Sequence, residues 1–150
     1  MLLRCVLARC QGQPLAVGRS EIKVDAAGDY FGLQACLAPT RETGERLKRL
    51  QEALRRRTGL AVTSGFGPRF LHSTGQLHKG GANNGLFLQI VDEPRADLEV
   101  PESDYSFGRL IAAQADGDAA ALVQRGRRLL RVRLGRETIG GLDRLLEAAG

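Results

Sequence analysis

The run LFLQIV at residues 86–91 decides the fold. Five of its six residues are apolar, whereas a strand with one face in water alternates apolar and polar side chains. A nearly continuous apolar run of this length is typical of a parallel strand that is covered on both faces. We therefore expect residues 86–91 to form the central strand of a parallel sheet.

Three further segments have the pattern of strands. Tyr30–Leu37 and Leu60–Thr63 are apolar and precede the central run along the chain. In Leu129–Leu134 the apolar side chains alternate with two arginines, Arg131 and Arg133. This alternation predicts an edge strand with one face in water.

Helix signals fill the segments between these strands. Thr40 is suited to cap a helix over residues 41–57, and Gly59 is suited to end it. A second helix begins at Asp104 or Ser106 and is broken at Gly117-Asp118, and a last helix covers Glu137–Ala149. The side chains of the second helix expected to face inward are Phe107, Leu110 and Ile111.

Strands that alternate with helices predict an α/β fold: a layered, mainly parallel sheet with helices on both faces. A chain of 150 residues is the length of one domain, which we place at residues 29–150. Residues 1–28 carry a short apolar stretch interrupted by glycine and proline, and they form a poorly defined N-terminal segment.

Composition narrows the possible partners. The net charge is +5 and the arginines are dispersed, while aromatic residues make up only 5% of the chain, too few for an RNA-stacking surface. This balance favours a phosphorylated small molecule over nucleic acid. No apolar run approaches the length of a membrane span, so no membrane partner is expected.

The cysteines and the first residues indicate the compartment. Three cysteines without a CxxC spacing argue against a metal site or a disulfide, and we expect neither metal nor cofactor. The opening residues are interrupted by Arg4 and Arg9 and lack a clear cleavage site, so they do not resemble a signal peptide. The expected location is the cytoplasm.

The polar segment GFGPRFLHSTGQLHKGGANN, residues 65–84, is the candidate functional loop. It follows the predicted strand Leu60–Thr63, and ligands of parallel α/β sheets bind at the carboxyl ends of strands. It contains both histidines of the chain, His72 and His78, together with Arg69 and Lys79.

Each of these side chains could have either a functional role or a structural one. His72 and His78 are the candidate catalytic residues, because imidazole can move a proton to a sugar ring oxygen, although each could instead only hydrogen-bond the loop backbone. Arg69 and Lys79 could bind phosphate or be plain surface charges. The other candidate substrate-binding residues supply hydroxyl groups or close backbone approach: Ser73, Thr74, Gly67, Gly80 and Gly81.

The same loop carries a family resemblance. GFGPRFLHSTGQLHKGGANNGLFLQI, followed by DYSFGRLIAAQADGDAAAL and RGRRLLRVRLG, resembles the C-terminal part of bacterial bifunctional transaldolase/phosphoglucose isomerase fusion proteins. DYFGLQACLAPT and LRRRTGLAVTSGFGPRF are also similar to that family, so the resemblance spans roughly residues 29–135. HKGGANNGLFLQI and DYSFGRL are more distantly similar to ordinary phosphoglucose isomerases.

The resemblance implies one sugar-isomerase (SIS-like) lobe that contributes to the interconversion of glucose 6-phosphate and fructose 6-phosphate. It also implies that the chain alone is incomplete. The family's glutamate base lies in sequence upstream of this chain, and the transaldolase barrel with its Schiff-base lysine is absent. A late Phe-Asp-Gln…Lys motif of ordinary isomerases has its nearest counterpart in Gln114–Arg125, which contains no lysine.

Two functions therefore remain open at the level of sequence. The chain could be an isomerase lobe of glycolysis or the pentose phosphate pathway, inactive or nearly so alone, whose sugar-phosphate site a partner lobe or a second copy completes. Alternatively, it could be a non-catalytic module that binds a sugar phosphate or another protein. Nucleic-acid binding is a distant third reading.

Overall fold

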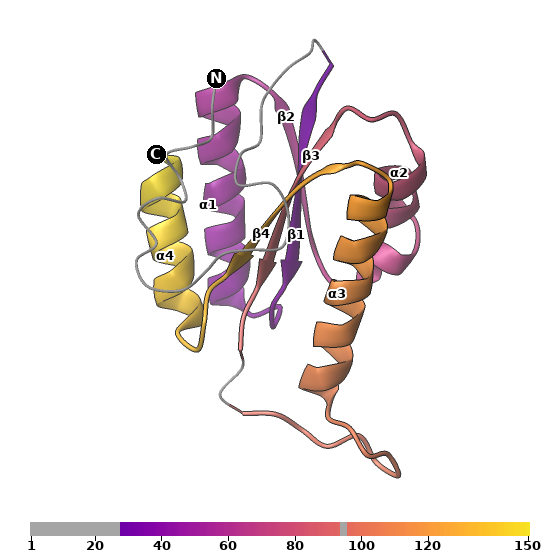
Figure 1. Cartoon of the computed structure of the whole chain (residues 1–150). Coiled ribbons are helices and arrows are strands. Elements are labelled where there is room, and N and C mark those ends of the chain that lie inside the picture. The colour runs from indigo at the N-terminus through magenta and orange to yellow at the C-terminus, as the bar shows by residue number, and fades with distance from the viewer. Residues whose placement is uncertain (1–27, 94–95) are drawn as a thin grey trace.

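The computed structural model describes residues 28–93 and 96–150, so the N-terminal segment predicted at 1–28 lies almost wholly outside the described residues. Four strands form one parallel sheet in the order β2-β1-β3-β4 (Figure 1). Their bounds are β1 Tyr30–Cys36, β2 Ala61–Phe66, β3 Gly85–Val91 and β4 Arg128–Arg133.

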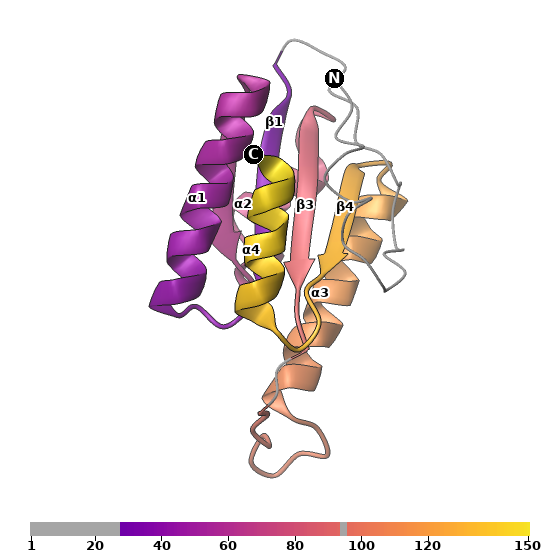
Figure 2. The same cartoon turned by 90° about the vertical axis from the view of Figure 1, so that its left-hand side faces the viewer.

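The helices lie on both faces of this sheet. α1 (Arg41–Thr58) and α4 (Thr138–Ala149) cover one face, and α2 (Thr74–Gly80) and α3 (Phe107–Gln124) cover the other (Figures 1 and 2). A short 3₁₀ turn, η2 (Arg69–Leu71), precedes α2. The predicted α/β fold with a layered parallel sheet is confirmed. Within the described residues, no helix combines the length and apolar character needed to cross a membrane.

The main core lies between the sheet and the α1/α4 layer. Successive strand residues point to opposite faces, and the residues of β1 and β3 that point to this side are apolar, as are the inner faces of both helices. All seven residues of β3 are buried and it pairs with a strand on each side, as its apolar run predicts. The largest of these fully buried side chains are Phe31, Leu33, Leu50, Leu54, Leu86, Ile90, Leu142 and Leu145.

The other face of the sheet is partly polar. Gln34, Gln89 and Arg131 stand in register on β1, β3 and β4, and all three are buried beneath α2 and α3. β4 is an edge strand as expected, but its predicted wet face is wrong at Arg131. Arg131 Nη1 lies 2.5 Å from Asp116 Oδ1 on α3, and this pairing allows the arginine to be buried.

The structure also corrects the second predicted helix. α3 runs without a break through Gly117-Asp118, because Asp118 points into the interface with α2 and forms an ion pair there. Ser106 is its cap, accepting from Arg109 N. Phe107, Leu110 and Ile111 are exposed rather than inward, because the first turns of α3 extend past the end of the sheet (Figure 1).

Candidate functional site

The candidate loop begins at the carboxyl edge of the sheet. β2 continues three residues further than the predicted Thr63, to Phe66, and Gly67 N then donates to Ala35 O at 2.8 Å. A Cβ on Gly67 would lie 2.8 Å from Cys36 Sγ, so only glycine fits without a shift of its surroundings. η2 and α2 follow, and α2 runs back toward the amino ends of the strands (Figure 1).

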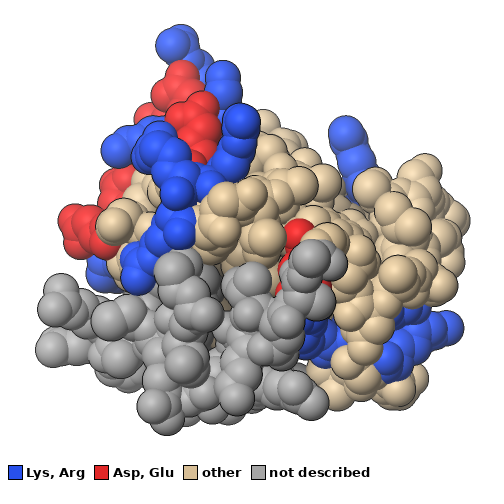
Figure 3. All heavy atoms as spheres, turned by 90° about the horizontal axis from the view of Figure 1, so that it is seen from above, with Lys and Arg blue, Asp and Glu red and all other residues tan. Residues whose placement is uncertain are grey.

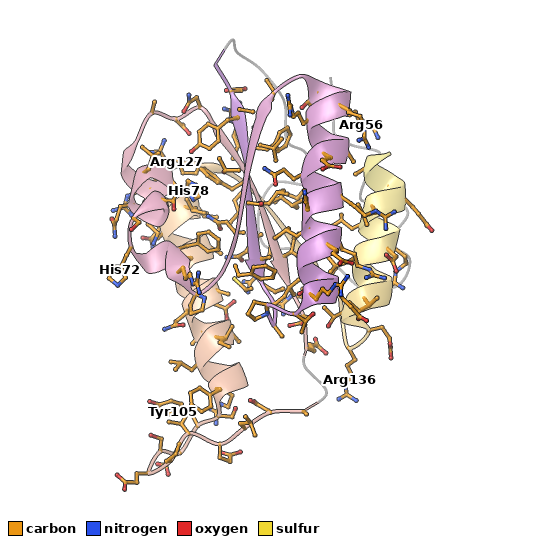
Figure 4. The ribbon with its side chains drawn as sticks, turned by 180° about the vertical axis from the view of Figure 1, so that it is seen from behind. Arg56, His72, His78, Tyr105, Arg127 and Arg136 are labelled. Carbon is orange, nitrogen blue, oxygen red and sulfur yellow. The ribbon has the colours of Figure 1, made fainter. Side chains whose placement is uncertain are left out.

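The structure divides the predicted site residues into two groups. Those of η2 and the start of α2 are exposed, and His72 points away from the body of the molecule (Figure 4). We call this set the exposed group: Arg69, His72, Ser73 and Thr74. Gly67, half-buried, lies just before it. Ser73 has φ +48°, a value that residues with side chains rarely adopt.

The second group occupies the far end of α2. His78 is only 4% exposed, and Lys79 is half-buried next to it. Gly80 is exposed and Gly81 half-buried where the helix ends. The structure therefore brings Arg69, His72, Ser73 and Thr74 together, and it holds the other four residues apart from them along the helix.

His78 is surrounded by aromatic and amide groups. Its Nδ1 lies 3.1 Å from Gln34 Nε2 in a buried hydrogen bond, and its ring centroid lies 4.8 Å from that of Phe87. Burial lowers the pKa of His78 below its ordinary value, and the Lys79 charge lowers it further, while the carboxylate of Asp118 opposes both effects. The lowered pKa favours the neutral form of the imidazole, and the catalytic role of His78 stays a prediction.

Lys79 is committed to contacts within the protein. Its Nζ lies 2.5 Å from Asp118 Oδ1 and donates to Phe70 O at 3.0 Å. The Asp118 side chain is 2% exposed, so the ion pair is shielded from water. Phosphate binding by Lys79 remains a prediction that would require this pair to open.

Arg127 holds the same end of α2 and was not among the residues suggested by the sequence. One of its guanidinium nitrogens, Nη2, donates to Lys79 O at 2.8 Å and to Gly81 O at 2.6 Å. The carbonyls at the end of a helix lack partners within the helix, and a cation there is favourable. Gln34 is a second contact residue that the sequence analysis does not name. A glutamine within the apolar strand Tyr30–Leu37 indicates a buried polar contact, because buried polar groups are hydrogen-bonded.

Two surface hollows lie elsewhere. One of about 600 Å³ lies between α1 and α4, and one of about 320 Å³ lies between α1 and β2. Gly65 and Phe66, the first two residues of the candidate loop, line the second hollow, and no later residue of that loop lines either one. Basic and acidic side chains are interleaved on the visible surface at the end of the molecule where α1 terminates (Figure 3).

Neither known proteins nor metal-binding geometry gives the site a further assignment. No protein-family model matches the sequence, and no curated protein matches it. Within residues 28–93 and 96–150, no group of three or more His, Cys, Asp or Glu side chains is arranged to hold a metal ion.

Proposed function

We propose that this chain is one lobe of a glucose-6-phosphate isomerase of the transaldolase-fusion type, and that it supplies part of a sugar-phosphate site. The observation that carries the proposal is the exposed group. Arg69, His72, Ser73 and Thr74 stand unburied where the chain leaves β2, next to the edge of a parallel sheet at which ligands bind. The motif GFGPRFLHSTGQLHKGG that carries the family resemblance supplies all four residues.

The exposed group has the chemistry that the substrate requires. A guanidinium such as that of Arg69 binds phosphate oxygens through two parallel hydrogen bonds. The hydroxyls of Ser73 and Thr74 can hydrogen-bond phosphate or sugar oxygens. His72 can move a proton to or from the ring oxygen when the sugar opens. In this proposal the buried His78 and the half-buried Lys79 hold α2 against β1 and α3.

A non-catalytic sugar-phosphate-binding module is the second candidate. It is favoured by the burial of His78, because His72 is then the only histidine of the chain that is exposed. The two candidates share a ligand and differ in turnover. A mixture of this chain with a complementary isomerase lobe would isomerise the sugar phosphate under the first candidate and would only bind it under the second.

Calorimetric titration of the full chain with glucose 6-phosphate tests ligand binding. Glucose and inorganic phosphate serve as separate titrants. A site that contacts both the sugar and the phosphate should bind glucose 6-phosphate more tightly than it binds glucose or phosphate alone. Loss of one charge-assisted hydrogen bond costs about 1.5–3 kcal/mol, so Arg69→Ala should weaken binding about tenfold or more.

Arg136→Ala is the matched control. Arg136 is also an exposed arginine, but it projects from the opposite side of the molecule from His72 (Figure 4). The control should bind like the wild-type chain. Equal affinities of the wild-type chain and both variants would show that Arg69 does not bind the ligand. Absence of binding heat with every titrant would contradict the proposed function.

A further inference from the structure

The layer between the sheet and the helices α2 and α3 is polar at its centre. Gln34 of β1, Gln89 of β3 and Arg131 of β4 are register partners, so their side chains stand side by side on the face that α2 and α3 cover (Figure 1). We call these three residues the polar row. Each of them is at most 7% exposed, and polar atoms this deeply buried are costly unless they are hydrogen-bonded.

The protein itself bonds only part of the polar row. Gln34 Nε2 lies 3.1 Å from His78 Nδ1 in a buried hydrogen bond, and Gln89 Nε2 donates to Ala115 O at 3.0 Å. Arg131 has the ion pair with α3 described above. The other end of each group has no such contact, because Oε1 of both glutamines and Nε of Arg131 are buried without a hydrogen-bond partner.

α3 shows the same shortage directly above the row. Gln114 is the neighbour of the residue whose carbonyl Gln89 bonds, and its Oε1 is also buried without a hydrogen-bond partner. Among the described residues, every buried side-chain atom of this kind belongs to the α2/α3 side of the sheet. The two outside the row and Gln114 are Asp118 Oδ1, which has its ion pair with Lys79, and Arg127 Nε.

The chemistry of these atoms identifies the partner that would satisfy them. Gln89 Nε2 donates to a carbonyl, which fixes Gln89 Oε1 as an acceptor, whereas Arg131 Nε is only a donor. A cation would suit the glutamine oxygens and be repelled by the guanidinium, and an anion would meet the reverse conflict. A water molecule both donates and accepts, and a buried water typically makes about three hydrogen bonds.

We propose that at least one ordered water molecule is bound between the polar row and α3. It donates to the oxygens of Gln89 and Gln114 and accepts from Arg131 Nε, so it connects the sheet to α3 where the side chains alone leave polar atoms unpaired. The site lies outside the exposed group, and it therefore does not depend on the proposed function.

Magnetic relaxation dispersion of water in a solution of the full chain tests the site, because it counts water molecules that stay inside a protein longer than the protein takes to tumble. The wild-type chain should hold at least one such molecule. Gln89→Met replaces the amide with an apolar side chain of similar length, and it should lower the count. Gln114→Met should lower it as well, and it changes a residue that is only half-buried and so less critical for folding.

Gln51→Met is the matched control. Gln51 is a half-buried glutamine on the α1/α4 side of the sheet, and the protein bonds both ends of its amide. Its Nε2 donates to Val62 O at 2.6 Å, and its Oε1 accepts from Ser64 Oγ at 3.0 Å. Because this amide leaves no end for water, the variant should keep the wild-type count.

A second measurement locates the water. Magnetisation transferred from water to the side-chain amide protons of Gln89 should be observed in the wild-type chain, and circular dichroism shows whether each variant is folded. A wild-type chain without any long-lived water would overturn the inference. A count that stays the same in folded Gln89→Met or Gln114→Met would overturn it too, because the water would then lie elsewhere.

Discussion

Gly75 shows how little space separates α2 from the turn before it. An added Cβ at this position would overlap the carbonyl oxygen of Phe70, whereas at Gly80 it would meet open space. Gly75→Ala should lower the free energy of unfolding by about 1–3 kcal/mol, since overpacking forces the backbone to move. Urea unfolding measures the change. Gly80→Ala is the control and should be neutral or slightly stabilising, and equal losses in the two variants would contradict this packing of α2.

His78 should make the stability of the protein dependent on pH. Because its folded-state pKa is lowered, the unfolded chain binds a proton more readily than the folded one. The contribution of His78 is therefore fully present above its ordinary pKa of about 6.5, and it is lost as pH falls through the folded-state value.

Thermal unfolding between pH 7.5 and about pH 5 checks this dependence. His78→Gln should flatten the fall in melting temperature below pH 6.5, whereas His72→Gln, which removes the exposed imidazole, should keep the wild-type slope. Matching slopes in the wild-type and His78→Gln chains would show that His78 is not buried as a neutral ring.

At the scale of single residues, the sequence predicts local contacts and misses distant ones. The Thr40 cap, the Gly59 helix end and the Ser106 cap follow from neighbours a few positions away, and all three are present in the structure. The burial of His78 depends on Gln34, which is 44 positions away along the chain. No local pattern in the candidate loop separates a histidine aimed at a ligand from one aimed at the sheet.

At the scale of elements, the pair Lys79–Asp118 joins α2 to α3 beneath the surface. Removing one partner of a shielded ion pair leaves a buried charge, which costs about 3–5 kcal/mol. We expect Asp118→Asn to destabilise the chain by that amount in urea unfolding. The double variant Asp118→Asn with Lys79→Met should recover much of the loss, because no unpaired charge remains.

The exposed pair Arg41–Glu45 on α1 provides the comparison. Both side chains are more than half exposed, and surface pairs contribute about 0–1 kcal/mol. Glu45→Gln should thus have little effect. If Asp118→Asn proved as mild as Glu45→Gln, α2 would not depend on this ion pair for its position.

The four strands and the helices α1, α3 and α4 could be predicted, but the bounds of some could not. The apolar run of β3 and the leucine face of α1 are strong signals, because burial selects the same side chains that the pattern detects. The predicted strand Leu60–Thr63 ends three residues before β2 does, because Ser64 and Gly65 pair with β1 but have no apolar pattern that indicates a strand. The break predicted in α3 failed because Asp118 is held in the helix by Lys79.

For the molecule as a whole, we expect that this chain alone does not isomerise glucose 6-phosphate. Moving a proton between adjacent carbons needs a base within hydrogen-bond reach of the sugar. In the proposed function that base is a glutamate of the other lobe, and a single lobe also loses the contribution of substrate orientation. A coupled enzymatic assay should give only background turnover. Turnover that disappears in His78→Ala would make the chain an enzyme by itself.

We propose that the exposed group on η2 and α2 binds a sugar phosphate. Backbone amide shifts recorded during a titration with glucose 6-phosphate test it most directly, because they report both binding and its location. We expect the shifts to cluster between Gly67 and Thr74 and to disappear in Arg69→Ala. Shifts confined to the hollow between α1 and α4, or no shifts at millimolar ligand, would contradict it.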